Sequence, residues 1–499
     1  MAIDEPGEEA AFDAAGLDSP QAVAPDEVSA EAPPPDIAPP AKPSDDSSQR
    51  RQEAARVFAL ASERHRNGEI DDAVRGYAKA LVLNPASADV YNNLGVALRA
   101  QGRLQAAIAC YQRSLALRPD HSDVYSNLGN ALRELGRLND AAANHQQAVH
   151  LSPDSAQAIY NLGLVLRDLG HLDEALACFD KALEIDPDFV YCHWDRSLAL
   201  LLRGDFKEGF AEYDWRWKLP HNPPRGYTQP LWDGAALDGR TILVHQEQGL
   251  GDMIQFVRYL PMVKERGGTV VVECQPELAR LISTVPGADK VVIRGSSPPP
   301  FDVYVPLLGL PRIFDSSIED IPDRVPYLAP PELHNVHLPV PFGTRLKVGL
   351  VWAGKRSHKN DRNRSCALSE FMVLVGMTGV AFYSLQKGEA AGELEDVACA
   401  ALIVDAGRMV EDFADTAAVI AQLDLVISVD TAVVHLAGAF GRPVWAVLPF
   451  ANDWRWMVER EDSPWYPTVR LFRQESPRDW EGVMGRVREA LRDLARHRQ

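Results

Sequence analysis

The sequence of 499 residues lacks several patterns that would assign a protein to a class at once. Its six cysteines form no C-x-x-C pair and no His/Cys cluster with zinc spacing, which excludes a zinc module and favours reduced thiols. No run of about 18 uncharged apolar residues occurs, so we expect no membrane insertion. The first ten residues are acidic and have no apolar core, which excludes a secretory signal and predicts a cytoplasmic protein.

Basic residues are also scarce relative to acidic ones. The formal net charge of −19 argues against nucleic acid or an anionic membrane as the main partner. The apolar fraction of 46% is ordinary, and the chain is long enough for about three folded units. Residues 1–50 are rich in Ala, Pro, Asp and Glu and have little to bury, so we predict a disordered leader there.

A repeat with a period of 34 residues begins after this leader. Its marks are a glycine, an alanine, an aromatic residue or histidine, and a closing proline, each at constant spacing. The glycines are Gly68, Gly102, Gly136, Gly170 and Gly204, and the prolines are Pro85, Pro119, Pro153 and Pro187. This period matches the tetratricopeptide (TPR) repeat, in which each unit is two helices. We predict that each glycine ends the first helix and each proline ends the second.

The repeats predict an α-solenoid over residues 51–222, with four regular units and a degenerate fifth. In the fifth unit Gly209, Arg216 and His221 replace Ala, Ala and Pro of the pattern. A degenerate last unit is typical of a cap or of a surface on which the next domain docks.

Asparagine recurs at Asn93, Asn127 and Asn161, on the first helix of three successive units. An asparagine amide can both donate to and accept from the backbone of an extended peptide, so these residues are candidates for binding an acceptor protein. The row resembles the asparagine ladder of the eukaryotic O-GlcNAc transferase. The alternative is that each asparagine contacts a neighbouring repeat.

The second half of the chain alternates short β-branched runs with helical segments. Strands are expected at 241–245, 269–274, 291–293, 303–305, 347–352, 381–385, 402–404, 425–428 and 444–448, with a helix at 253–265. Such alternation predicts parallel sheets with right-handed crossovers. We therefore expect an α/β module of two Rossmann-like lobes, at 223–340 and 341–499, the second ending in a helix.

Ligands of such sheets bind beyond the carboxyl ends of the strands, and three segments follow strands there. The segment 247–252 contains Gly249 and Gly251, which suit a close backbone approach or an ordinary turn. The segment 355–364 has five basic residues and suits either a diphosphate or a solvated loop. In the segment 428–435, Asp430 could orient a ligand or cap the following helix.

Two of these segments, taken together, resemble the motifs of a known family. The chain has Gly249-Leu-Gly-Asp252 and Asp430-Thr-Ala-Val-Val-His-Leu-Ala437, which resemble the paired marks of GT-B glycosyltransferases of the heptosyltransferase type. The segments 247–252, 352–365 and 449–456 resemble those of bacterial members fused to TPR repeats. The resemblance covers the chain from about residue 54 onward.

The resemblance implies transfer of a sugar from a nucleotide-activated donor without a metal or other cofactor. It makes Asp252 the candidate catalytic base, since the accepting hydroxyl must lose a proton. The candidate donor-binding residues are Gly249, Gly251, Lys359, Arg362, Arg364, Gln386, Lys387, Asp430, Thr431 and His435. For His435 two roles stay open, packing beneath the site or contact with the donor. The Trp-rich segment 453–456 suits a core element more than a sugar-facing wall.

The acceptor implied by the resemblance is a Ser/Thr hydroxyl of a protein held in the TPR groove. Some members resemble alphaproteobacterial flagellin glycosyltransferases, which makes flagellin the suggested acceptor. Two alternatives stay open: an enzyme acting on a glycan or lipid-linked sugar, and a TPR adaptor whose transferase module has lost catalysis.

Overall fold

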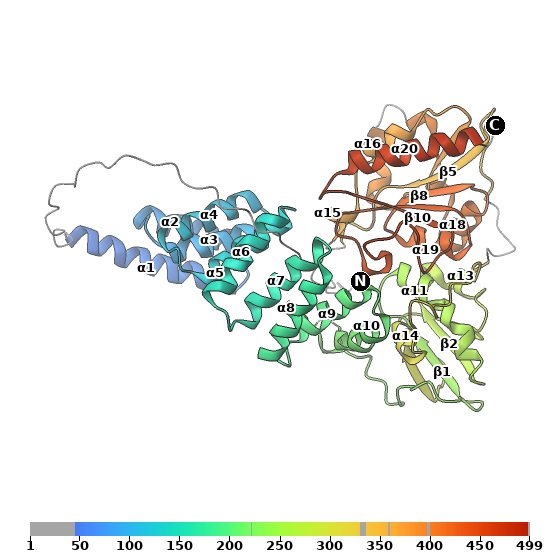
Figure 1. The fold of residues 1–499 in the computed structure, drawn as a ribbon, viewed down its shortest axis with the longest axis horizontal. Helices are drawn as coiled ribbons and strands as arrows, with labels where there is room; N and C mark the ends of the chain where they lie inside the picture. Colours follow the sequence, from blue (N-terminus) through green and yellow to red (C-terminus); the bar gives the residue numbers. More distant parts are fainter. Residues whose placement is uncertain (1–44, 221, 330–335, 358–359, 397–399, 498–499) are drawn as a thin grey trace. The chain divides into compact units, whose positions relative to one another are not determined.

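Apart from the start of the first helix, the helices of the repeat region begin and end where the period of 34 residues predicts. The structure is a computed structural model and describes residues 45–497 except 221, 330–335, 358–359 and 397–399. Consecutive helices pack as pairs, α1 with α2 and so on to α7 with α8 (Figure 1). Their bounds are α1 Asp45–Arg66, α2 Ile70–Leu83, α3 Ala88–Ala100, α4 Leu104–Leu117, α5 Ser122–Glu134, α6 Leu138–Leu151, α7 Ala156–Asp168 and α8 Leu172–Ile185.

The periodic glycines all have a left-handed backbone conformation. Their φ angles run from 71° at Gly102 to 102° at Gly204. Each stands just after the first helix of its unit, a position that favours glycine because no Cβ meets the carbonyl there. The predicted role of these glycines in ending helices is confirmed.

A second set of periodic glycines lets the two helices of a unit approach closely. A Cβ on Gly95 would lie 2.5 Å from the ring of Tyr111, and one on Gly129 would lie 2.6 Å from the ring of His145. The aromatic or histidine ring at each period therefore fills the space that the glycine leaves. His145 is fully buried in this position.

Ion pairs connect the first helices of successive units. Arg99 Nε donates to Glu134 Oε1 over 2.6 Å, and Arg133 Nε lies 3.8 Å from Asp168 Oδ2. The second pair is nearly buried, with side-chain exposures of 9% and 10%. These contacts link neighbouring units, as nearest-neighbour stacking in a solenoid requires.

The described chain divides into two compact units, one ending at Asp188 and the other beginning at Phe189. The degenerate fifth repeat thus belongs to the second compact unit, together with the two lobes. It consists of α9 (Val190–Arg203), α10 (Phe206–Glu212) and a 3-10 segment, η1 (Tyr213–Lys218). Phe206 packs on Trp454 and Trp465 of the C-terminal lobe, with ring centroids 6.2 Å and 5.6 Å apart.

The first lobe is built on a parallel sheet of four strands in the order β3-β2-β1-β4. The strands are β1 Thr241–His245, β2 Thr269–Cys274, β3 Lys290–Ile293 and β4 Val303–Pro306. Its helices are α11 Leu250–Phe256, α12 Leu260–Lys264, α13 Ala279–Ile282 and α14 Leu310–Ile313. The central strand β1 is buried after its first residue, which explains its continuous apolar run.

The second lobe has a parallel sheet of six strands in the order β10-β9-β8-β5-β6-β7. The strands are β5 Leu346–Val351, β6 Val380–Ser384, β7 Ile403–Asp405, β8 Leu425–Val429, β9 Val444–Leu448 and β10 Val469–Arg473. The helices are α15 Asp361–Arg364, α16 Leu368–Phe371, α17 Glu393–Asp396, α18 Phe413–Ile420, α19 Ala432–Ala439 and α20 Trp480–His497. Helix α20 lies near α16 (Figure 1) and buries Val483, Val487 and Leu491 in the core of this lobe.

The predicted fold class, a helical solenoid followed by two parallel α/β lobes, is confirmed. Three details differ. Helix α1 starts at Asp45, inside the predicted leader, whose residues 1–44 lie outside the described part of the chain. The helix expected at 253–265 is split by a 3-10 turn (η2, Val257–Tyr259) just before Pro261, which has no N–H to continue the helix. Strand β10 was not predicted, because its alternating Val-Arg-Leu-Phe-Arg473 run follows Pro467 and carries two charges.

Across the described ranges of residues 45–497, no helix combines the length and the apolar character that crossing a membrane requires.

Candidate functional site

The candidate site lies where the carboxyl ends of strands from both lobes meet. In the first lobe the strand order changes direction around β1, which is followed by the segment 247–252 and α11. In the second lobe it changes around β5 and β8, and Asp430 follows β8. Helix α11 packs against α19, the helix after β8 (Figure 1). These are the switch points at which open α/β sheets bind ligands.

Asp252 is held by an arginine of the opposite lobe. Its Oδ2 accepts from the Gly249 N–H over 2.7 Å, and its Oδ1 forms an ion pair with Arg455 Nη2. The remaining guanidinium nitrogens of Arg455 donate to Gln255 Oε1 over 2.6 Å and to Asp453 Oδ1 over 2.9 Å. One arginine, 8% exposed, therefore joins α11 of the first lobe to the segment after β9.

Two carboxyl groups on which Arg455 acts, those of Asp252 and Asp430, have raised pKa values. Burial raises the pKa of Asp252, and the charge of Arg455 opposes that rise. Burial also raises the pKa of Asp430 to about 6, with a further rise from Asp453 and opposition from Arg364 and Arg455. Carboxyl groups with raised pKa values are better proton acceptors near neutral pH, and they cluster at functional sites.

One residue of the basic segment 355–364, which follows β5, acts on the candidate site. The charge of Arg364 acts on Asp430. A Cβ on Gly354 would lie 2.7 Å from Arg364 Nη2, so the guanidinium passes close to the backbone at this glycine. Arg362 is exposed on the short helix α15. Lys359 lies outside the described residues.

The segment after β8 begins helix α19 through a threonine. Thr431 is the N-cap, and its Oγ1 accepts from the Val433 N–H over 3.3 Å. The cap considered for Asp430 is therefore made by its neighbour, and the charges of Asp453, Arg364 and Arg455 act on the Asp430 carboxyl. His435, on the same helix, shares a 2.9 Å hydrogen bond with the Tyr466 hydroxyl and stacks on Trp456.

Gly251 lies at the contact between the lobes. A Cβ there would lie 2.9 Å from His435 Cδ2 and 3.5 Å from Ala432 Cα. The structure thus gives Gly251 and His435 a packing role. Gly249 is the N-cap residue of α11. The donor contacts predicted for these three residues stay predictions.

Gln386 and Lys387 bind backbone groups of their own lobe. Gln386 Oε1 accepts from the N–H groups of Trp352 and Ala353 over 3.1 Å and 3.0 Å, which fixes the chain leaving β5. Lys387 Nζ donates to the carbonyls of Gly407 and Val410 over 3.0 Å and 2.7 Å. Their predicted contact with the nucleotide stays a prediction.

The asparagine row makes contacts within the solenoid. Asn127 Nδ2 donates to Asn92 Oδ1 of the preceding unit over 3.0 Å, and Asn161 Oδ1 accepts from Gln157 over 2.9 Å. Asn161 is only 7% exposed, whereas Asn93 and Asn127 are half-buried. The first contact agrees with the neighbouring-repeat alternative, and peptide binding by the row stays a prediction.

Sequence reasoning missed Arg455, which connects most of the cluster. It lies in the Asp453-Trp-Arg-Trp456 run, where the two tryptophans drew the interpretation towards packing. Trp454 and Trp456 are indeed buried, as the core interpretation expected. A single arginine between two buried aromatics was the available signal, since a buried charge needs a partner.

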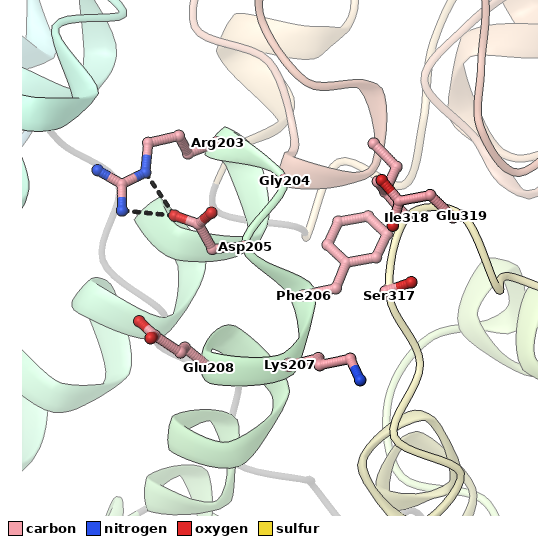
Figure 2. A pocket seen from close by; sticks show the side chains of 9 residues that line it. All are labelled: Arg203, Gly204, Asp205, Phe206, Lys207, Glu208, Ser317, Ile318 and Glu319. Atoms are coloured by element: carbon pink, nitrogen blue, oxygen red, sulfur yellow. Dashed lines mark hydrogen bonds and ion pairs between the residues drawn. The ribbon is translucent and has the colours of Figure 1, made fainter.

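A surface pocket of about 360 Å³ lies apart from this cluster, between the fifth repeat and residues 317–319 of the first lobe (Figure 2). Its lining side chains are mostly charged and include the Arg203–Asp205 ion pair. None of the predicted site residues lines this pocket. Over the described residues, no group of three or more His, Cys, Asp or Glu side chains is placed to hold a metal ion.

Comparisons with known proteins match both halves of the chain. Models of the tetratricopeptide repeat match residues 61–102, 86–153 and 156–189, and the model of glycosyltransferase family 9 (heptosyltransferase) matches residues 389–477. The last range contains β7 to β10 and so includes Asp430 and Arg455.

Among curated proteins, Protein FlbA of Caulobacter vibrioides is 29% identical over 318 residues. The match covers 58% of this chain and 52% of FlbA, so the chain spans about half the length of this relative. Solved structures match a smaller share of the chain. A crystal structure of MamA is 26% identical over 31% of this chain and 91% of MamA, with a TM-score of 0.29. PilF of Pseudomonas aeruginosa is 24% identical over 33% of this chain and 76% of PilF, with a TM-score of 0.31.

The period of the helices, the two parallel sheets and the matched segments lead to one assignment: the chain combines tetratricopeptide repeats with a glycosyltransferase family 9 (heptosyltransferase) domain.

Proposed function

We propose that this protein transfers a sugar from a nucleotide-activated donor to a Ser/Thr hydroxyl of a protein held by its TPR groove. The observation that carries the proposal is the ion pair of Asp252 with Arg455, which joins the two lobes at the switch points of their sheets. The charges of Arg455 and Arg364 also act on Asp430 there. The family 9 match over the second lobe supports a transferase. The repeats support a protein acceptor.

Asp252 serves as the base in this proposal. Its raised proton affinity suits removal of the hydroxyl proton as the acceptor oxygen attacks the anomeric carbon. The ion pair with Arg455 keeps the carboxylate charged and oriented between turnovers. A neutral Asp252 could not accept the proton. Burial raises the pKa of Asp252 and the charge of Arg455 lowers it, so the two effects oppose each other.

Positive charge for the departing nucleotide phosphate comes from the segment after β5 and from the N-terminus of α19. Arg364 is close enough to Asp430 to affect its pKa, and Thr431 opens the helix beside it. Charge of this sign, fixed before the reaction, stabilises the leaving group as it develops. The proposed mechanism uses no metal ion. Flagellin remains the acceptor that the sequence resemblance suggests.

The test is a turnover assay on the full chain with a panel of UDP-, GDP-, ADP- and CMP-activated sugars, measuring released nucleotide. Mass spectrometry of proteins from cells with and without the gene then identifies modified acceptors. Asp252→Asn should abolish transfer to protein, whereas Asp289→Asn, which breaks the ion pair with Lys264, should not.

Three results would contradict the proposal in different ways. Modification of glycans or lipid-linked sugars alone would favour the first alternative. Protein capture without turnover on any donor would favour the adaptor. Full transfer by the Asp252→Asn variant would remove the assigned base.

A further inference from the structure

The segment that closes the degenerate fifth repeat carries a buried arginine where the other units have a small residue. Arg216 stands at the position of Ala80, Ser114, Ala148 and Ala182, each buried at the centre of its unit. Arg216 is itself 1% exposed. A guanidinium so far from solvent needs a specific partner to offset its desolvation.

Its partner is the first residue of the segment 247–252. Arg216 Nε donates to Glu247 Oε2 over 2.7 Å, and Nη2 lies 3.3 Å from Oε1. Glu247 is also 1% exposed, and its Oε1 accepts from the Leu308 N–H over 3.0 Å. The carboxylate is thus fixed at both oxygens. Arg216 Nη1 also donates to Asp214 Oδ1 over 2.7 Å, so removal of Glu247 would leave the guanidinium with Asp214, whereas removal of Arg216 would leave the Glu247 carboxylate buried without this counter-ion.

The next residue of the segment is held from the same side. Gln248 Nε2 donates to the hydroxyl of Tyr213, three residues before Arg216, over 2.9 Å. Two successive residues that lead into α11 therefore rest on η1. Four residues later comes Asp252, whose side chain binds the Gly249 N–H of the same segment.

We propose that Arg216 and Tyr213 are positioning residues, which hold the segment 247–252 so that Asp252 faces the reaction site. This inference rests on the proposed function for the role of Asp252. It assigns the fifth repeat to the transferase and not to the acceptor-binding groove. The inclusion of the fifth repeat in the unit that begins at Phe189 agrees with this assignment.

The same junction offers a matched control. Lys207 of α10 forms an ion pair with Asp315 of the first lobe, but these side chains are 52% and 74% exposed. Exposed pairs contribute little to stability because water and salt screen them. Lys207→Gln thus breaks a charge contact between the same two parts of the chain without touching the segment 247–252.

Hydrogen exchange of the full chain, followed by mass spectrometry, tests the inference without any donor. Amides of the segment 247–252 and α11 should exchange at least tenfold faster in Arg216→Lys and Glu247→Gln than in the wild type. A smaller increase is expected in Tyr213→Phe, which removes a single hydroxyl and should fold if the charge variants do not. Lys207→Gln should exchange like the wild type.

Kinetics separate positioning from simple support of the fold. With a donor that the wild type uses, the Arg216 and Glu247 variants should lose at least tenfold in kcat while KM for the donor changes little. The inference is wrong if exchange in the segment is unchanged, if every peptide accelerates equally in all variants including Lys207→Gln, or if exchange rises without a loss of kcat. A wild type without turnover would overturn the proposed function and leave the exchange result standing.

Discussion

Replacement of His145 by phenylalanine should stabilise the repeat region and remove part of its sensitivity to acid. His145 is fully buried beneath Gly129, at the position that Tyr111 and Phe179 fill in the neighbouring units. Within the described residues, neither of its ring nitrogens has a hydrogen-bond partner. Leaving a buried polar group unsatisfied costs about 1–3 kcal/mol, and phenylalanine removes that cost while keeping a ring in place.

The pH dependence follows from the pKa of His145. Burial lowers this pKa from 6.5 to about 3, with smaller contributions from Arg133 and Arg99. The unfolded chain therefore binds a proton near pH 6.5 that the folded chain refuses. His145 therefore does not lower the free energy of unfolding above the pKa of the unfolded chain. It lowers that free energy progressively as the pH falls from there towards the pKa of the folded chain. Between about pH 7.5 and pH 5.5 the loss is about 1–2 kcal/mol, since one pKa unit corresponds to slightly more than 1 kcal/mol.

The chain provides a convenient assay for this region. All ten tryptophans lie at or after Trp194, so none belongs to the unit that ends at Asp188. Denaturant unfolding followed by far-ultraviolet circular dichroism reports both compact units, whereas tryptophan fluorescence reports only the compact unit that begins at Phe189. The transition seen by dichroism alone should move to higher denaturant in His145→Phe and lose part of its pH dependence between about pH 7.5 and pH 5.5.

His150→Asn is the control, because His150 is exposed on the same helix. This variant should keep the pH dependence of the wild type. Two results would refute the reasoning: a His145→Phe variant that is less stable at neutral pH, or one whose transition still shifts with pH as far as that of the wild type.

Three further predictions concern the site and the groove. Arg455→Met should raise the pKa of Asp252, because burial then acts without its opposing charge, and the acidic limb of the pH profile of kcat/KM should move to higher pH. Gly251→Ala should destabilise the second unit by about 1–3 kcal/mol in tryptophan-monitored unfolding, because its Cβ would overlap His435; Gly485→Ala, where the space is open, should not. Changing the three row asparagines together to alanine should weaken acceptor binding in a pull-down titration and spare donor binding, and unchanged acceptor affinity would remove their assigned role.

The fold could be predicted far better than the site. The period of 34 residues determined the helices because several positions repeat it independently, and nearly every strand coincides with an apolar run. The places where the prediction differed have local causes, such as Pro261 within an expected helix. Contacts between residues that are distant in the sequence could not be predicted. The sequence indicates that Asp252 follows β1, but nothing near Asp252 indicates that Arg455, about 200 residues later, binds it.

The same limit applies to Arg216. Its departure from the repeat pattern was visible, and it suggested decay of the fifth unit. The structure shows that the change exchanges a helix-packing residue for a buried charge whose partner lies in the first lobe. A substitution that breaks a repeat can therefore create a specific contact, and only the three-dimensional arrangement distinguishes the two cases.

The division at Asp188 has a practical consequence for recombining this protein with others. A chimera that exchanges the tetratricopeptide repeats between related proteins would naturally be cut where the repeats end, near residue 222. Such a cut would pair a foreign η1 with the native Glu247 and leave a carboxylate enclosed without its arginine. A crossover between Asp188 and Phe189 keeps both partners on the same parental side, so the unit of exchange in this protein is four repeats rather than five.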